Sequence, residues 1–370
     1  MSKRPGEDGS ALIKRQRVED DPALQQIIVA SDGNSANKGA LIQTIRRTSG
    51  LQAPIMCLQG HQGEILDIKF SPDGDSLASA GADKTIMLWR VYGDCKNYGL
   101  LRLPKGAATS IAFASDTTLI AACTDHTLFY FDLQTGEVLR RFRGHRDIVN
   151  TVDVQRGGEG RGLFVSGSDD GTVRVWSEDT KEAIKIVELG YPITAVKWSA
   201  DGQSVFVGGV DNDVHVFSLA HHSISYSLRG HTDTITSLAL SPSSSLLLSS
   251  SMDSVLHLWS VQPFAPTINT TNPTLHPRLV RSFYGAPAGF EGLLRKASWS
   301  KHPQADGGHL VAVGGADRSL TIWDATTGEI KYKLPGHTGT VVATDWSPKE
   351  PIVVSAGVEG VIYLGEVETR

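Results

Sequence analysis

Short runs of alternating apolar and small or polar residues recur along most of the chain, and each run ends at a tight turn or an aromatic residue. The stretch SAGADKTIMLW at 79–89 shows the pattern: small residues, a turn containing Asp83, then alternating aliphatics that end at Trp89. Alternation of this kind predicts β-strands joined by hairpins. Close variants return as VSGSDDGTVRVW at 165–176, LSSSMDSVLHLW at 248–259 and VGGADRSLTIW at 313–323.

The aromatic residue at the end of each run sets the period of the repeat. Seven equivalent positions occur, and the last has lost its aromatic side chain: Trp89, Phe131, Trp176, Phe217, Trp259, Trp323 and Gly365. Successive positions lie 42, 45, 41, 42, 64 and 42 residues apart, which is the spacing of a four-stranded propeller blade. The sequence therefore predicts seven blades, with an insertion between the fifth and sixth positions.

Gly-His pairs precede several of these positions at a constant distance. Gly60-His61, Gly230-His231 and Gly336-His337 each place the histidine 28 residues before the marker. His145 lies 31 residues before its marker, and the surplus falls in a glycine-rich loop at 156–162, where a hairpin tolerates insertion. In spacing, residue type and copy number the chain resembles the WD40-repeat family. The resemblance implies an all-β fold, a seven-bladed WD40 β-propeller.

Four residues of a repeat are expected to form a hydrogen-bonded network inside the blade. The indole N–H of a buried Trp89 needs an acceptor, and Ser79, on the neighbouring strand, offers its hydroxyl. His61 can bond this hydroxyl through one ring nitrogen and Asp83 through the other. The predicted sets are His61, Ser79, Asp83 and Trp89; His145, Ser166, Asp170 and Trp176; and His231, Ser249, Asp253 and Trp259.

Serine, histidine and aspartate together also form the catalytic triad of hydrolases. A nucleophile is needed once, at an exposed site with an oxyanion hole, whereas this set recurs three times and always ends in a Trp. The sequence contains no Walker motif, dinucleotide-binding fingerprint or HExxH zinc motif. We therefore expect the quartets to be structural, and we expect no catalytic residues, cofactor, metal or small-molecule substrate.

The last repeat predicts how the ring closes. After Gly336-His337 the sequence supplies three strands and no fourth, and an open blade would leave an unpaired sheet edge. The segment LQAPIMCL at 51–58 is the candidate for the missing strand, pairing beside 361–366. This prediction divides the chain into a propeller over 49–370 and a tail over 1–48.

The tail mixes Gly, Ser, Asn and charges of both signs without a sustained apolar period, so we expect it to be disordered. Two basic clusters in it resemble a bipartite nuclear import signal and predict localisation in the nucleus. Such clusters also occur by chance as solubilising charges. The candidate residues are Lys3, Arg4, Lys14, Arg15 and Arg17.

Charge and cysteine content narrow the classes of ligand. The formal net charge is −5, so the chain lacks the positive charge that favours direct binding to nucleic acid. Three cysteines without CxxC spacing argue against disulfides and a zinc site, and we expect Cys57, Cys95 and Cys123 to be buried free thiols. No apolar run is long enough to span a membrane. Because the net charge is negative, contact with RNA is expected to be mainly indirect.

Loop strings that a propeller does not require make the resemblance more specific. VYGDC at 91–95, VQPFAP at 261–266 and YKLPGH at 332–337 are similar to strings in a spliceosomal group of WD40 proteins, the WD40 subunits of the U5 small nuclear ribonucleoprotein (snRNP). The resemblance implies a monomeric, non-enzymatic scaffold of the U5 particle and the tri-snRNP that acts in pre-mRNA splicing. Its implied partners are the large U5 scaffold protein and the neighbouring GTPase and helicase subunits.

Two other functions of WD40 proteins agree less well with the sequence. A substrate receptor of a cullin-type ubiquitin ligase usually carries WDxR after the third strand of a blade, whereas the equivalents here read WSED, WSVQ and WDAT. A G protein β subunit needs an N-terminal coiled coil, and the tail is interrupted by Pro22, Gly33 and Gly39. The ligase receptor is the alternative function.

Partner binding is expected on the face of the ring where the Gly-His turns and the turns bearing Asp both open, which we call the top face. The alternatives are the blade sides and the Pro- and Thr-rich segment 261–294, which is expected to be a surface loop. Phe264, Tyr284 and Phe290 in this segment either fold back onto the blade sides or anchor a partner. The top-face candidates are Glu64, Arg146, Asp147, Asp169, Tyr191, Asp211, Asp233 and Met252.

Overall fold

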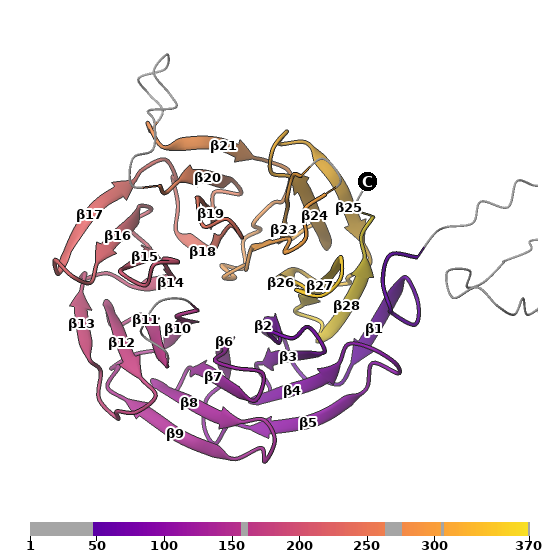
Figure 1. Cartoon of the computed structure of the whole chain (residues 1–370), viewed down its shortest axis with the longest axis horizontal. Coiled ribbons are helices and arrows are strands. Elements are labelled where there is room, and N and C mark those ends of the chain that lie inside the picture. The colour runs from indigo at the N-terminus through magenta and orange to yellow at the C-terminus, as the bar shows by residue number, and fades with distance from the viewer. Residues whose placement is uncertain (1–46, 157–161, 263–275, 305–306, 369–370) are drawn as a thin grey trace, which may run out of the picture. The chain divides into compact units, whose positions relative to one another are not determined.

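The computed structural model describes residues 47–156, 162–262, 276–304 and 307–368. Within these ranges 28 β-strands form seven four-stranded antiparallel sheets around a central axis (Figure 1). The predicted all-β, seven-bladed propeller is confirmed. The prediction of a disordered tail falls almost entirely outside the described residues. In the described part of the chain, no helix is long and apolar enough to cross a membrane.

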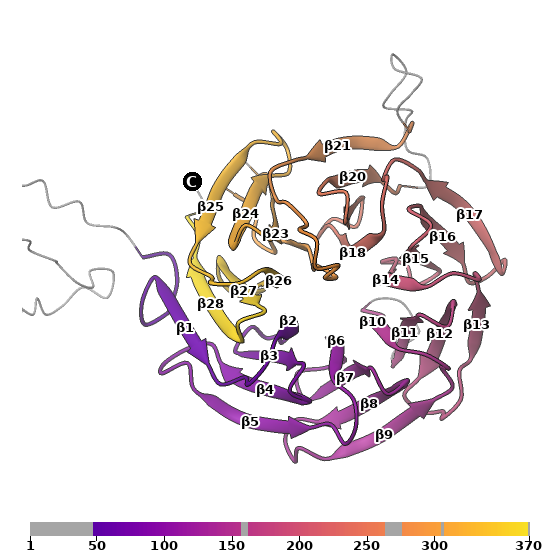
Figure 2. The same ribbon diagram turned by 180° about the vertical axis from the view of Figure 1, so that it is seen from behind.

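Six blades are built from four consecutive strands, ordered from the axis outward, as both views of the ring show (Figures 1 and 2). Blade 1 contains β2 (Ile65–Phe70), β3 (Ser76–Gly81), β4 (Thr85–Arg90) and β5 (Asn97–Arg102); blade 2 contains β6 (Ala108–Phe113), β7 (Thr118–Cys123), β8 (Thr127–Asp132) and β9 (Val138–Arg143); blade 3 contains β10 (Val149–Val154), β11 (Leu163–Ser168), β12 (Thr172–Ser177) and β13 (Lys185–Glu188). Blade 4 contains β14 (Ile193–Trp198), β15 (Ser204–Gly209), β16 (Val214–Ser218) and β17 (Ser223–Leu228); blade 5 contains β18 (Ile235–Leu240), β19 (Leu246–Ser251), β20 (Leu256–Ser260) and β21 (Leu279–Phe283); blade 6 contains β22 (Ser298–Trp299), β23 (Leu310–Gly314), β24 (Ser319–Asp324) and β25 (Ile330–Pro335).

Blade 7 joins the two ends of the propeller sequence. It contains β26 (Val341–Trp346), β27 (Ile352–Gly357) and β28 (Val361–Glu366), and its outermost strand is β1 (Ile55–Gln59). The antiparallel register runs from Ile55 opposite Gly365 to Gln59 opposite Val361. The backbone N–H of Ser49 also donates to Oε1 of Glu366 at 3.0 Å. Every strand edge of β28 is therefore occupied.

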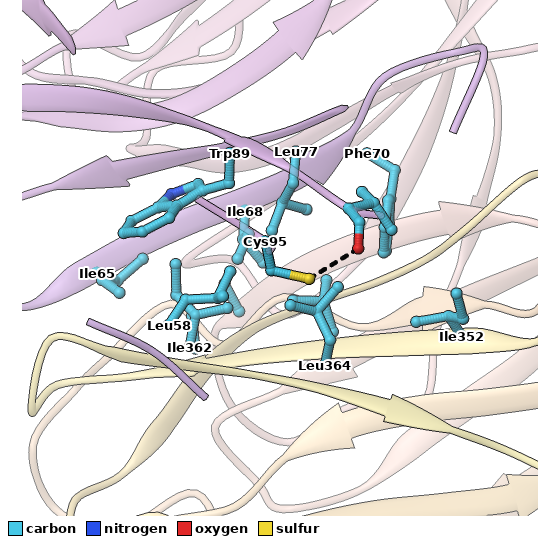
Figure 3. Close-up of a cluster of buried hydrophobic side chains, with 14 of the residues drawn as sticks. Leu58, Ile65, Ile68, Phe70, Leu77, Trp89, Cys95, Ile352, Ile362 and Leu364 are labelled. Carbon is cyan, nitrogen blue, oxygen red and sulfur yellow. Dashed lines mark hydrogen bonds between the residues drawn. The ribbon is translucent and has the colours of Figure 1, made fainter. Parts of the chain in front are cut away.

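A continuous apolar cluster packs blade 7 against blade 1 (Figure 3). Leu58 of β1 and Leu364 of β28 meet Ile65 and Trp89 of blade 1 in this cluster. The thiol of Cys95 donates to the carbonyl oxygen of Val91 at 2.9 Å, the dashed line in Figure 3. Burial of these side chains supplies the hydrophobic free energy that holds the two ends of the ring together.

Small residues on the second strand of a blade allow the next blade to approach closely. A Cβ added to Gly208 of β15 would lie 2.6 Å from Cγ2 of Ile235 in blade 5. Such a distance is below any real side-chain contact, so the backbone position requires glycine. The alternation of small and aliphatic residues that the sequence repeats is thus the packing surface between blades.

The two faces of the ring differ in the connections they carry. Because the strands of a blade alternate in direction, its four connections alternate between the faces. The turn that leads into the first strand and the turn between the second and third strands therefore share one face, which is the top face defined above. The connections between first and second strands, and between third and fourth strands, form the bottom face.

Two sequence expectations are wrong in part. The segment 261–294 is not loop throughout, because β21 supplies the fourth strand of blade 5, with Leu279 and Phe283 buried on its inward side. Phe264 lies outside the described residues. Cys95 and Cys123 are buried free thiols as expected, but Cys57 is exposed, because it lies on the outermost strand of the last blade with its side chain facing away from the core.

Candidate functional site: blade networks and the top face

The third blade shows how the predicted quartet is joined. The indole N–H of Trp176 donates to Oγ of Ser166 at 2.8 Å, and Nε2 of His145 lies 2.7 Å from the same oxygen. Nδ1 of His145 lies 2.9 Å from Oδ2 of Asp170. An ionised carboxylate can only accept, so Nδ1 carries the proton and Nε2 accepts from the serine hydroxyl. One chain of hydrogen bonds therefore links the turns of the top face to the core of the blade.

The quartets of the first and fifth blades have the same geometry. His61 lies 2.7 Å from Ser79 and 2.9 Å from Asp83, and Trp89 donates to Ser79 at 2.9 Å. In the fifth blade the corresponding distances are 2.7 Å from His231 to Ser249, 2.9 Å from His231 to Asp253 and 2.8 Å from Trp259 to Ser249. The structure brings all three sets together.

The arrangement does not suit a hydrolase. The hydroxyls of Ser79, Ser166 and Ser249 are fully buried, and each already binds an indole N–H and an imidazole. A nucleophile must reach a substrate carbonyl beside an oxyanion hole, whereas the space next to these hydroxyls is filled by a tryptophan ring. The described residues also hold no group of three or more His, Cys, Asp or Glu side chains that could bind a metal.

The seventh blade contains a variant network that the sequence analysis did not assign. Nε2 of His337 lies 2.8 Å from Oγ of Ser355, and Nδ1 contacts the carboxylate of Glu359. Gly365 replaces the tryptophan, and the ring of Tyr363 instead packs edge-on against His337 with centroids 4.8 Å apart. The sequence signal was present, because Glu359 follows His337 at the same distance as Asp83 follows His61.

The sixth blade replaces the network by a buried arginine. The guanidinium of Arg295 is fully buried and donates to the carbonyl oxygens of Ser251, at 3.2 Å, and Gly314, at 2.9 Å. It also donates to two carbonyls of the segment 284–297, which leads into β22 on the top face. This segment carries Phe290, whose side chain is fully exposed.

Two buried histidines make the fold sensitive to acid. Burial lowers the pKa of His145 to about 4, although Asp170 opposes the shift. Burial lowers the pKa of His257, whose ring centroid lies 4.2 Å from that of His231, to about 4 as well. Since an unfolded histidine titrates near 6.5, the unfolded chain binds these protons first, and stability falls as the pH drops from about 6.5 to about 4. The pKa of Asp170 is lowered, so its stabilising charge persists throughout this window.

We therefore expect each histidine to remove about 2 kcal/mol of folding free energy between pH 7 and pH 5. Urea unfolding at the two pH values measures the loss. His257→Gln should reduce it by about half, because one of the two titrating groups is gone. The matched control is His221→Gln at an exposed histidine, which should leave the loss unchanged. Equal losses in the wild type and in His257→Gln would contradict the assignment.

The predicted partner-binding candidates all belong to connections of the top face, but they differ in exposure. Glu64, Arg146, Asp147 and Asp233 are exposed. Asp169, Tyr191, Asp211 and Met252 are half-buried, and three of them have contacts within the propeller. Asp169 accepts from Nδ2 of Asn150 at 2.6 Å, Asp211 contacts Nε2 of His215 at 2.6 Å, and Tyr191 packs against the apolar cluster between blades 3 and 4.

Comparison with known proteins agrees with this geometry. The WD domain, G-beta repeat family matches residues 52–90, 136–177, 186–218, 222–260 and 328–364. The pre-mRNA-splicing factor cwf17 of Schizosaccharomyces pombe is 35% identical over 357 residues, 96% of both chains. The U5 small nuclear ribonucleoprotein 40 kDa protein of Homo sapiens is 40% identical over 363 residues, again 96% of both chains, and that of Dictyostelium discoideum is 38% identical over 330 residues, 89% of this chain and 88% of the relative. The chain therefore belongs to the WD40-repeat family and, within it, to the group that contains the U5 small nuclear ribonucleoprotein 40 kDa protein and cwf17.

Proposed function

We propose that this chain is a WD40 subunit of the U5 snRNP and acts in pre-mRNA splicing, in the nucleus, as a non-enzymatic scaffold. The observation that carries the proposal is the extent of the similarity, since relatives named as a U5 protein and a splicing factor match over 96% of both chains. A shared propeller alone would not support one function, because this fold hosts many. The candidates for nuclear import, Lys3, Arg4, Lys14, Arg15 and Arg17, lie outside the described residues.

The scaffold role is supported by how the polar groups of the blades are used. The Ser, His and Asp side chains that resemble catalytic groups are buried and bonded to one another, which leaves the loops as the variable, accessible part of the molecule. A rigid ring that presents loops on one face suits the binding of protein segments. Its partners would be the large U5 scaffold protein and the neighbouring GTPase and helicase subunits.

The charge of the top face favours a basic protein segment over RNA. Of the four exposed candidates, Glu64, Asp147 and Asp233 are acidic and only Arg146 is basic. Carboxylates repel the phosphate backbone and attract Lys and Arg side chains. The exposed Phe290 adds an apolar contact on the same face, of the kind that often dominates the binding energy. RNA would then be reached through the partners.

The test is to recover the tagged protein from nuclear extract and to measure co-purified U5 RNA. We expect wild-type protein to bring down U5 RNA, and the double variant Glu64→Lys, Asp233→Lys to recover about tenfold less, because placing positive charges against a basic segment costs more than about 1 kcal/mol. Lys181→Glu, at an exposed residue of the bottom face, is the matched control and should behave as wild type. Exposed substitutions change stability by under about 0.5 kcal/mol, so all three proteins should melt alike.

Each outcome assigns a different surface or function. Full recovery with the double variant and loss with Phe290→Ala would move the contact to the segment 284–297. Absence of U5 RNA from the wild-type sample, with cullin-ligase adaptors in its place, would replace the proposal by the alternative function, a substrate receptor of a ubiquitin ligase.

A further inference from the structure

Five cations lie around the axis of the ring, four of them at or beyond the bottom-face ends of first strands and Lys296 just before β22. Lys69 lies near the end of β2, Lys197 near the end of β14, and Arg156 just beyond the end of β10. Lys296 and Lys301 flank β22. The first strands of the blades surround the axis in Figure 1, so these five residues of blades 1, 3, 4 and 6 lie on or beside strands that line one region. We call these five residues the axial cluster; their concentration contrasts with the net charge of −5 for the whole chain.

Three aspartates on first strands of the blades, Asp345 among them on β26 of blade 7, neutralise only part of this charge. Each accepts a backbone N–H of the neighbouring blade: Asp67 from Ile111 at 3.0 Å, Asp153 from Trp198 at 2.9 Å and Asp345 from Phe70 at 2.9 Å. Two of them also pair with lysines, Asp67 with Lys69 at 3.7 Å and Asp153 with Lys197 at 2.6 Å. The carboxylates thus link neighbouring blades by hydrogen bonds and neutralise the charges of two of the five cations.

Within the axial cluster, Lys296 is largely buried and lacks a protein partner among the described residues. Its side chain is 8% exposed, and among the described residues its ammonium makes no hydrogen bond or ion pair. Burial lowers the pKa of Lys296, Asp67 opposes this shift, and the like charge of Lys69 reinforces it. An ammonium that is largely desolvated and has no protein partner destabilises a fold, and its remaining contact with solvent lets an anion reach it.

The other cations are placed to share one ligand. The charges that act on Lys301 are those of Asp345, Arg156, Lys197 and Lys69, which come from four other blades. Water reaches this region, since the side chains of Lys69 and Lys197 are 28% and 29% exposed. Cations that converge from several sides fit a compact ligand with charge in every direction better than an extended chain.

We propose that the axial cluster binds a compact anion bearing several phosphate groups, which enters from the bottom face and pairs with Lys296 and Lys301. Lysine ammonium groups bind phosphate oxygens as point charges. A peptide carboxylate carries one charge per residue along an extended strand, so it would satisfy fewer of these cations at once. The site is independent of the top face and of the proposed role in splicing.

The test uses inorganic tripolyphosphate as the probe and thermal unfolding of the full chain as the readout. Tripolyphosphate should raise the Tm of the wild type by several degrees at saturation, because it binds only the folded state. Lys296→Met should melt above the wild type without the probe, since a largely desolvated charge with no protein partner is removed, and should lose the Tm shift. Lys301→Gln, at an exposed residue, should weaken the affinity about tenfold. Lys105→Gln, an exposed lysine of the top face, should bind as wild type.

Three results would overturn the proposal. The first is no Tm shift of the wild type by tripolyphosphate at about 0.05 M NaCl, where screening is weak. The second is an equal shift in Lys296→Met, Lys301→Gln and Lys105→Gln, which would show general ion binding. The third is a shift by oligoglutamate as large as that by tripolyphosphate, which would assign the cluster to an acidic protein segment.

Discussion

Replacing Trp176 by alanine should lower the free energy of unfolding by about 3–5 kcal/mol, because it empties a core position and leaves the hydroxyl of Ser166 without its donor. Trp176 is fully buried and packs against both Phe142 and Phe164. The measurement is urea unfolding followed by circular dichroism. His145→Ala should cost less, about 1–3 kcal/mol, since it removes hydrogen bonds from Ser166 and Asp170 but little apolar volume.

Trp176→Phe separates the packing of the ring from its hydrogen bond. It keeps most of the apolar contact and removes the indole N–H, so the expected loss lies between those of the two alanine variants. A matched change at a blade without the network is Phe131→Ala, which should cost core packing alone. An unchanged unfolding curve for either alanine variant would show that the network adds nothing to stability.

The second large effect concerns closure of the ring. Deletion of residues 1–46 should leave a folded propeller, whereas deletion of 1–59 should abolish cooperative unfolding. The longer deletion removes β1 and exposes the edge of β28. It also removes two buried leucines, Leu51 and Leu58, from the core of the last blade, and burial of each stabilises the fold by about 1.5–3 kcal/mol.

A milder variant controls for the loss of chain length. Leu58→Asp in the full chain leaves every backbone hydrogen bond of β1 possible but places a charge among Ile362 and Leu364. It should destabilise the propeller strongly as well, because a buried unpaired carboxylate cannot be solvated there. A soluble protein that melts cooperatively without residues 1–59 would mean that blade 7 is stable with three strands.

Repeats made the fold predictable, and departures from the repeat limited the prediction. Trp89, Trp176 and Trp259 recur at a regular spacing with the same polar companions, so sequence alone could assign their blades. The strand Leu279–Phe283 was not predicted because prolines and threonines surround it in the sequence. It forms because blade 5 offers an unpaired strand edge and a buried side for it. Tertiary contact, which no local pattern records, decides such cases.

The site was less predictable than the fold for a similar reason. The network of His337 and Glu359 differs from the consensus by one methylene and one missing ring, and only the structure shows that it closes. Arg295 gives no sequence signal at all, since its partners are carbonyl oxygens from three separate segments. Hydrogen bonds from a side chain to backbone carbonyls leave no pattern of residue types in the sequence.

The pairing of β1 with β28 also sets the order of events while the chain is being synthesised. Among the described strands β1 leaves the ribosome first, yet β28, the strand with which it pairs, is the last to appear. Until then the nascent chain exposes a strand edge and the apolar side chain of Leu58, while blades 1 to 6 can form one after another. We therefore expect a chaperone to be needed at this segment during translation, and the final step of folding to be slow because it joins residues so distant in the chain.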